Sequence, residues 1–192
     1  MGTSTRGSED PKLSELMAET RACVLRKAGL FGAYQQADSP EGVAAWRRAG
    51  TGRGTYLYGP PGTGKTWAAA CAVRAAVLRG RPARLVAASR LLDEIREGYD
   101  GGDRDAASRA ASTWLLALDD LGAERETEWA VERLTRLVDD RTAAGLPTIV
   151  TSNYRLGQLR DRIGGVDGAR IASRLGGACE LVEMAGQDRR LA

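Results

Sequence analysis

One glycine-rich stretch, at residues 56–66, constrains the fold of this chain more than any other part of the sequence. A hydrophobic run leads into the stretch, and a helix-forming run follows it directly. Glycines let the backbone amides turn inward, and the N-terminus of the following helix adds partial positive charge, so the loop favours phosphate. It matches the Walker A pattern G-x-x-x-x-G-K-[ST] in the strand–loop–helix context that this motif requires. The loop residues are Gly59, Pro60, Pro61, Gly62, Thr63, Gly64, Lys65 and Thr66.

The residue types in this loop suit a nucleoside triphosphate. The ammonium group of Lys65 would reach the β- and γ-phosphates, and the hydroxyl of Thr66 would bind Mg²⁺. A glycine-rich turn that matches by accident is the alternative. We therefore predict ATP and Mg²⁺ as cofactors of the Walker A loop.

Two acids, Asp119 and Asp120, end a continuous apolar run at residues 114–118. Such a run is typical of a strand buried on both faces, and ligands bind at the carboxyl ends of strands in open parallel sheets. We predict Asp119 as a metal ligand beside Thr66, and Asp120 as the residue that orients or deprotonates the attacking water. A strand end with two solvated acids is the alternative.

Polar residues also follow the next predicted strand, at residues 147–150. Asn153 offers both donors and an acceptor, so it could contact the γ-phosphate or the lytic water; a turn-forming Ser–Asn pair is the alternative. Arg170 and Arg174 lie four residues apart on one predicted helical face. An arginine supplied by a neighbouring subunit could neutralise charge on the γ-phosphate, and ordinary surface arginines are the alternative.

Strands alternate with helices from residue 54 onward, which predicts a three-layer α/β domain with a parallel sheet of five strands. The predicted strands are 54–58, 83–88, 114–118, 147–150 and 180–184. The predicted helices are 12–28, 40–48, 66–79, 89–99 with Ser89 as N-cap, a weak one within 100–112, 126–144, 155–163 and 168–175.

The chain divides into three predicted regions. Residues 1–11 are rich in Gly, Ser, Thr and charge, so we expect a disordered leader. Residues 12–53 would form an N-terminal amphipathic helix and a connector, and residues 54–192 the ATPase core. The N-terminal helix either packs against the core or docks on a partner.

Composition narrows the function classes. The chain of 192 residues has no histidine and three isolated cysteines, Cys23, Cys71 and Cys179, which excludes Cys/His metal sites and His-dependent triads. No apolar run approaches the roughly 18 residues of a membrane span, so we expect a reduced, cytoplasmic chain. The net charge of +3 is compatible with single-stranded DNA. Six arginines flank the expected ligand edge: Arg90, Arg96, Arg104, Arg109, Arg155 and Arg160.

Five blocks of the sequence together resemble the DnaC/IstB-type AAA+ ATPases, which are helicase loaders and transposition helper proteins. The blocks are residues 57–66, 115–124, 148–153, 170–175 and 186–190, and the resemblance covers residues 54–190. It implies an AAA+ sheet of order 5-1-4-3-2 without a helical lid domain. It also implies Asp119 and Asp120 as Walker B acids, Asn153 as sensor 1, Arg174 as an arginine finger acting in trans, and Arg190 as a nucleotide-binding sensor 2.

The resemblance implies a homo-oligomeric ATPase that loads a replicative helicase onto DNA during replication. A transposition helper ATPase, whose partner is a transposase, shares every motif and stays open as an alternative. A small-molecule or nucleotide kinase is the alternative of a different class, but kinases need an arginine-bearing lid that the sequence does not show. An adaptor that binds ATP but hardly hydrolyses it is a further alternative, because Asp120 is one methylene shorter than the Glu often used in AAA+ proteins and slow turnover would follow.

Overall fold

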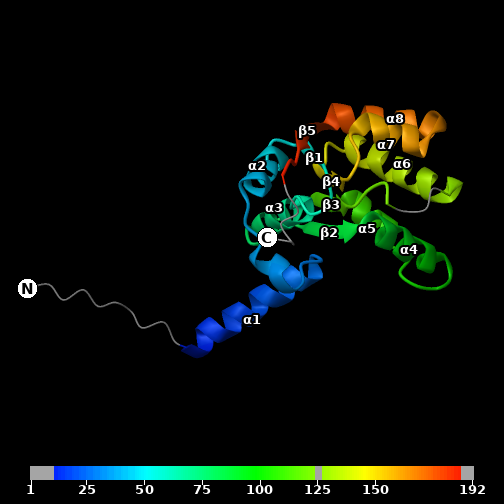
Figure 1. The fold of residues 1–192 in the computed structure, drawn as a ribbon. Helices are drawn as coiled ribbons and strands as arrows, with labels where there is room; N and C mark the ends of the chain where they lie inside the picture. Colours follow the sequence, from blue (N-terminus) through cyan, green and yellow to red (C-terminus); the bar gives the residue numbers. More distant parts are fainter. Residues whose placement is uncertain (1–10, 124–126, 187–192) are drawn as a thin grey trace, which may run out of the picture.

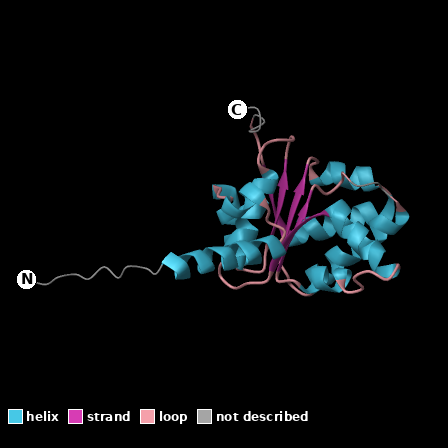
Figure 2. Cartoon of the chain, turned by 90° about the horizontal axis from the view of Figure 1, so that it is seen from below, coloured by secondary structure: helices cyan, strands magenta, loops and turns pink. Residues whose placement is uncertain are grey.

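A parallel sheet of five strands forms the centre of the chain (Figure 1), in a computed structural model that describes residues 11–123 and 127–186. The strands lie in the order β2-β3-β4-β1-β5, which is the predicted order read from the other edge. Figure 2 shows helices on both sides of the sheet, so the predicted three-layer architecture is confirmed. The strands are β1 Gly54–Tyr58, β2 Ala83–Ala87, β3 Leu115–Asp119, β4 Thr148–Ser152 and β5 Cys179–Glu183.

The central strands are buried because apolar side chains occupy both of their faces. In β3, Leu116 and Leu118 pack into one hydrophobic cluster while Leu115 and Ala117 pack into the cluster on the opposite side of the sheet. The polar residues that follow the apolar runs belong to the strands as well, since β3 continues to Asp119 and β4 to Ser152. Both strands therefore deliver polar side chains to the same carboxyl edge of the sheet.

The helices agree with the predicted ones to within a few residues at each end. The predicted N-cap at Ser89 is wrong, because β2 runs directly into α4 and Ala87 occupies the cap position. Beyond the predicted set, a short 3-10 helix precedes α2. The elements are α1 Pro11–Lys27, η1 Gly32–Gln36, α2 Pro40–Ala49, α3 Lys65–Val77, α4 Ala88–Tyr99, α5 Ala106–Ser112, α6 Glu128–Ala143, α7 Leu156–Ile163 and α8 Gly165–Ala178.

The segment before β1, predicted as a connector, packs on the sheet through buried Leu30, Ala37 and Ala45. Helix α2 lies against α3 at very short range, because a Cβ at Gly42 would come within 2.5 Å of the Ala68 carbonyl oxygen. A side chain at this position would force the two helices apart. The segment is thereby fixed relative to the helix that follows the Walker A loop.

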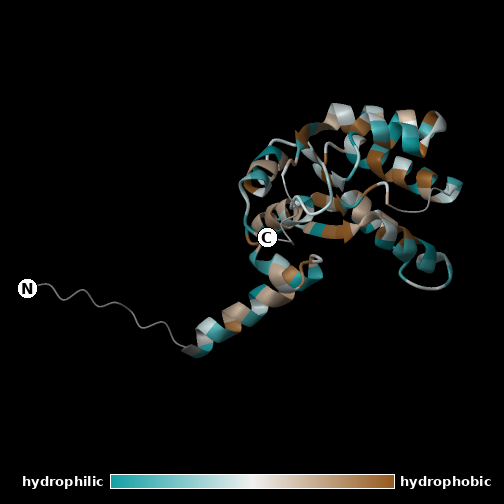
Figure 3. Ribbon diagram, viewed as in Figure 1, coloured by the Kyte–Doolittle hydropathy of each residue, from teal (hydrophilic) through white to brown (hydrophobic). Residues whose placement is uncertain are grey.

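Helix α1 extends away from the sheet (Figure 1), and its main contacts are with α3 and η1. Leu25 is buried, whereas Leu16 and Met17 are 59% and 58% exposed. Figure 3 shows apolar and polar residues interspersed along α1. Within the chain, the helix therefore packs through its last turns rather than along its whole length.

The predicted leader lies outside the described residues except for Pro11, which begins α1. Among the described ranges, no helix is both long enough and apolar enough to cross a bilayer.

Candidate nucleotide site

The loop between β1 and α3 contains three glycines with positive φ, Gly59, Gly62 and Gly64, and that of Gly62 is 79°. Gly59 has φ 148°, and a Cβ there would approach the Met184 carbonyl oxygen to 2.2 Å. Gly64 has φ 91° and is the N-cap residue of α3. These positive φ angles disfavour L side chains. The predicted glycine-rich loop therefore exists as a strand–loop–helix unit whose backbone runs into a helix N-terminus.

The ammonium group of Lys65 lies inside this loop. Lys65 is only 7% exposed, and its Nζ donates to the carbonyl oxygens of Gly59 at 2.8 Å and Pro60 at 2.7 Å. The hydroxyl of Thr63 donates to the same Pro60 carbonyl at 2.9 Å and closes the loop. Lys65 therefore lies where a bound triphosphate would meet its positive charge.

Three oxygen-bearing side chains converge on the Walker B position. Asp119 Oδ1 accepts a hydrogen bond of 2.9 Å from the Thr66 hydroxyl and one of 2.6 Å from the Thr151 hydroxyl. Burial raises the pKa of the Asp119 carboxyl, and the hydrogen bonds from Thr151 and Thr66 oppose that rise. The contact between Thr66 and Asp119 joins α3 to β3, as expected for two residues that share a ligand.

These oxygens fit a magnesium ion that is shared with a nucleotide. Mg²⁺ prefers oxygen donors and is commonly held by one or two carboxylates together with substrate phosphates. Thr66 and Asp119 supply a hydroxyl and a carboxylate that already lie 2.9 Å apart. In the described part of the chain, no group of three His, Cys, Asp or Glu side chains could hold a metal on its own. The donor set therefore suits a cation that completes its coordination with phosphate.

Asp120 adopts a strained backbone conformation beside this position. Its φ of 57° is the one positive φ of a non-glycine residue in residues 11–123 and 127–186. Such a conformation costs about 1–3 kcal/mol and persists where the surroundings hold it. Here the Asp120 N–H donates to the Thr151 hydroxyl at 2.9 Å, and Asn153 Nδ2 donates to Asp120 Oδ1 at 3.3 Å. The two residues predicted to handle the attacking water thus contact each other.

A cavity of about 530 Å³ brings together predicted residues from the loop after β1, the start of α3 and the carboxyl ends of β3 and β4. This volume is within the usual range of small-molecule sites. Its lining contains five of the eight Walker A residues together with Asp119, Asp120 and Asn153. The lining residues are Tyr34, Pro61, Gly62, Gly64, Lys65, Thr66, Trp67, Asp119, Asp120, Thr151 and Asn153.

Two aromatic residues of this lining, Tyr34 and Trp67, were not predicted from the sequence. Their ring centroids lie 5.9 Å apart with an interplanar angle of 47°. The Trp67 indole N–H donates to the Asp38 carbonyl at 2.8 Å, and Arg74 Nε donates to the Gln35 carbonyl at 2.8 Å. Both bonds tie the segment that carries Tyr34 to α3. In the sequence, Trp67 stands directly after the Walker A motif, and this position was the available indication that an aromatic side chain lies beside the nucleotide site.

Arg174 does not line this cavity, and the position of Arg190 is not described. Arg174 lies on α8, outside the cavity lining, and its Nε donates to Asp139 Oδ1 at 3.0 Å. Arg190 lies outside the described residues. An interaction of Arg174 with a nucleotide would therefore have to involve the site of another subunit.

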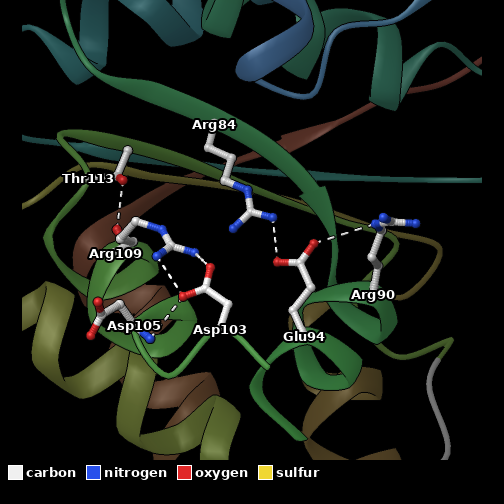
Figure 4. A network of polar contacts seen from close by, with 7 residues as sticks. All are labelled: Arg84, Arg90, Glu94, Asp103, Asp105, Arg109 and Thr113. Atoms are coloured by element: carbon white, nitrogen blue, oxygen red, sulfur yellow. Dashed lines mark hydrogen bonds and ion pairs between the residues drawn. The ribbon is translucent and has the colours of Figure 1, made fainter. Parts of the chain in front are cut away.

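Most of the arginines predicted to contact DNA are paired with acids. Figure 4 shows the contacts of Arg90 with Glu94 and of Arg109 with Asp103. The nitrogen–oxygen distance is 3.5 Å for Arg90 and Glu94, and Arg155 pairs with Glu183 at 2.7 Å. The Arg109 hydrogen bonds lower the pKa of the exposed Asp103 carboxyl. Arg96 and Arg160 also have acidic neighbours, Asp93 at 4.0 Å and Asp161 at 2.7 Å. The net positive charge that these residues offer to DNA is correspondingly small.

Comparisons with known proteins agree with this site. The sequence model of the IstB-like ATP-binding proteins matches residues 50–192. The chain is 34% identical over 114 residues to an insertion-sequence ATP-binding protein of Mycobacterium tuberculosis, covering 58% of this chain and 45% of that protein. It is 26% identical over 158 residues to the replicative helicase loader DnaI of Bacillus subtilis, covering 77% of this chain and 51% of DnaI. The chain spans about half the length of these curated relatives.

Solved structures agree on the fold. The crystal structure of DnaI matches with a TM-score of 0.66 at 26% identity, covering 77% of this chain and 84% of that one. AMPPCP-bound DnaA from Aquifex aeolicus matches with a TM-score of 0.64 at 23% identity, covering 78% and 46%. The fold is thus that of an AAA+ P-loop domain. The family model matches most of the length of this chain, so the chain belongs to the family of IstB-like ATP-binding proteins.

Proposed function

We propose that the protein binds Mg²⁺ and ATP in the cavity between the Walker A loop and the carboxyl ends of β3 and β4, and hydrolyses the ATP. The observation that carries this proposal is the direct contact of Thr66 with Asp119 within a cavity that also contains Lys65, Asp120 and Asn153. These residue types are the parts that phosphoryl transfer to water requires.

Each of these residues has a defined role in the proposed reaction. The bound Mg²⁺ would neutralise charge on the β- and γ-phosphates, and Thr66 and Asp119 would hold it. Asp120 accepts a proton from the attacking water or orients it, and Asn153 keeps the Asp120 carboxylate in place while it contacts water or phosphate. Lys65 stabilises the negative charge of the phosphates.

Replacement of Lys65 tests the nucleotide site. We expect Lys65→Ala to abolish tight binding of a fluorescent ATP analogue, because the substitution removes the cation buried in the phosphate loop. Lys27→Ala is the matched control, since Lys27 is exposed at the end of α1. Wild-type affinity of a folded Lys65→Ala protein would overturn the assignment.

We further propose that hydrolysis requires a second copy of the chain, whose Arg174 completes the site. Arg174 is exposed, lies outside its own nucleotide cavity, and cannot lose its proton at working pH. ATPase activity per subunit should then rise with protein concentration. Mixing Arg174→Ala with Lys65→Ala subunits should recover activity, because one contributes an intact site and the other an intact arginine. A mixture that co-assembles and stays inactive would contradict the role in trans.

The partner protein is proposed from the relatives. The M. tuberculosis relative and an insertion-sequence ATP-binding protein of Pseudomonas fluorescens, which is 36% identical over 97 residues, favour a transposition helper that works with a transposase. DnaI, aligned over 77% of this chain, favours a cytoplasmic helicase loader in DNA replication. Affinity purification from the native host decides between them by which protein, a transposase or a replicative helicase, is retained with ATP.

A further inference from the structure

Two arginines of α8 share one carboxylate of α6, a helix that lies beside α8 (Figure 1). Arg174 Nε donates to Asp139 Oδ1 at 3.0 Å, and an Arg170 terminal nitrogen pairs with Oδ2 of the same carboxylate. The Asp139 side chain is only 18% exposed, whereas those of Arg170 and Arg174 are 54% and 53% exposed. The acid is thus largely enclosed by the two cations that it contacts.

This contact leaves part of the Arg174 guanidinium available. Among the described residues, Arg174 bonds to the protein through Nε alone, so its two terminal nitrogens can donate to another acceptor. A guanidinium is planar, so a bond that fixes Nε also restricts the direction in which the terminal nitrogens point. Ile171 and Leu175, each one residue further along, bury an adjacent face of α8 and hold its backbone. Because the backbone of α8 is already held, what Asp139 restricts is the conformation of the long Arg174 side chain.

Arg170 determines the net charge of the cluster that it forms with Asp139 and Arg174. Asp139 and Arg174 alone would be electrically neutral, which would weaken any attraction of Arg174 for phosphate. With Arg170 on the other carboxylate oxygen, two cations and one anion leave a net charge of +1. Arg170 thus allows Asp139 to orient Arg174 without cancelling its charge.

We propose that Asp139 is a positioning residue for Arg174, and that Arg170 offsets the charge of Asp139. Neither residue touches the nucleotide. This inference rests on the proposed role of Arg174 in the site of a second copy.

Asp139→Asn tests the proposal in the full chain. We expect kcat to fall by about 10- to 100-fold, in the range found when a reacting group is misplaced by about 1 Å. The affinity for ATP and the assembly state should remain unchanged, because the nucleotide cavity does not include Asp139. Asp140→Asn is the matched control, since Asp140 is the next residue on α6 and lies 3.9 Å from Arg136 on the surface. Asp139→Glu, which keeps the charge, should recover part of the rate.

A mixing experiment separates positioning from a general loss of structure. Asp139→Asn subunits keep an intact nucleotide site, and Lys65→Ala subunits keep an intact Arg174 with its Asp139. Their mixture should regain activity if Asp139 acts through Arg174. A purely structural defect would not be repaired by an arginine from another subunit.

Replacement of Arg170 tests whether this residue offsets the charge of Asp139. Arg170→Gln should lower kcat because Asp139 then neutralises Arg174. The double variant Asp139→Asn/Arg170→Gln should be no slower than Asp139→Asn, since the acid to be offset is absent. If Asp139→Asn does not fold, the kcat of Arg170→Gln still tests the proposal. A wild-type kcat for Arg170→Gln would then overturn it.

The kcat of Arg174→Ala, measured in parallel, separates a failure of the proposed role of Arg174 in trans from a failure of the proposed positioning role of Asp139. Wild-type turnover of Arg174→Ala would refute the proposed function in trans. A slow Arg174→Ala together with a wild-type rate for Asp139→Asn would refute only the positioning role of Asp139.

Discussion

The hydroxyl of Thr151 donates a hydrogen bond of 2.6 Å to Asp119. It also accepts a hydrogen bond from the backbone N–H of Asp120 at 2.9 Å, so one side chain of β4 contacts both predicted Walker B acids, the last residue of β3 and the residue after it. Thr151 itself is buried. Its hydroxyl therefore fixes the carboxylate that would bind the metal and the strained backbone of the residue beside it.

We predict that Thr151→Val, which keeps the shape and removes the hydroxyl, lowers kcat by at least about tenfold. A hydrogen bond to a charged group contributes about 1.5–3 kcal/mol, and tenfold corresponds to about 1.4 kcal/mol. Thr55→Val is the control, because the buried Thr55 hydroxyl has no hydrogen-bond partner in the described part of the chain. Steady-state ATPase assays of both variants give the comparison, and equal loss in both would argue against a specific role of Thr151.

Asp120→Asn should retain binding of Mg·ATP and lose hydrolysis. The amide preserves the size of the side chain and its contact with Asn153, but it cannot take a proton. Single-turnover hydrolysis with saturating ATP measures the chemical step without the influence of binding. Hydrolysis at the wild-type rate would remove Asp120 from the proposed mechanism.

Tyr34→Leu should weaken ATP binding by about tenfold, because stacking of a base on an aromatic ring contributes about 1–3 kcal/mol. Inorganic tripolyphosphate, which has no base, should bind the variant and the wild type equally when it competes with a fluorescent ATP analogue. Tyr99→Leu serves as control, since Tyr99 is exposed on α4 and does not line the cavity. Equal loss for ATP and tripolyphosphate would mean that Tyr34 supports the loop rather than the base.

Arg141→Met should lower the free energy of unfolding by roughly 3 kcal/mol or more, since each buried acceptor left unpaired costs about 1–3 kcal/mol. Arg141 is 1% exposed and donates to the carbonyls of Ala110, Thr113 and Pro147. Burial lowers the pKa of its guanidinium to about 10. Arg136→Met, on the exposed face of the same helix, should change the value by less than about 0.5 kcal/mol in urea titrations.

Binding of single-stranded DNA should require ATP, tolerate any sequence and weaken as salt rises, because neutralised phosphates release counterions. Arg104 is the residue of the predicted set for which no acidic partner is found in residues 11–123 and 127–186. Fluorescence anisotropy at two salt concentrations measures how steeply the affinity for DNA falls with salt. Absence of binding at low salt with ATP would leave a switch that acts on proteins alone.

The parts of the site that were predictable are those encoded by consecutive residues. The Walker A loop and the Asp119–Asp120 pair each combine a local conformation with a side-chain chemistry, so their positions followed from the sequence. The strand order came with the family resemblance, because a pattern of strands and helices does not state which strands are neighbours. It is now confirmed by the pairing of β1 with β4 and β5.

Features that depend on tertiary contacts were not predictable. Tyr34 meets Trp67 only because the segment before β1 folds back onto α3. The burial of Arg141 runs against the expectation that a charged residue in an amphipathic helix faces solvent, and it depends on carbonyls from α5 and from Pro147, the residue before β4. The sharing of Asp139 by two arginines likewise depends on how α6 and α8 pack.

The position of β1 in the sheet has a consequence for synthesis on the ribosome. Tyr56 pairs with Val150 on one side and Leu181 on the other, so the strand that carries the phosphate loop emerges early while both of its neighbours emerge late. Until β5 leaves the exit tunnel, β1 lacks a partner along one whole edge. Contacts so distant in sequence form slowly and leave strand edges exposed to aggregation. The nucleotide site of a nascent chain therefore forms only after β4, which brings Thr151 and Asn153, has left the ribosome, and ATP cannot assist folding before then.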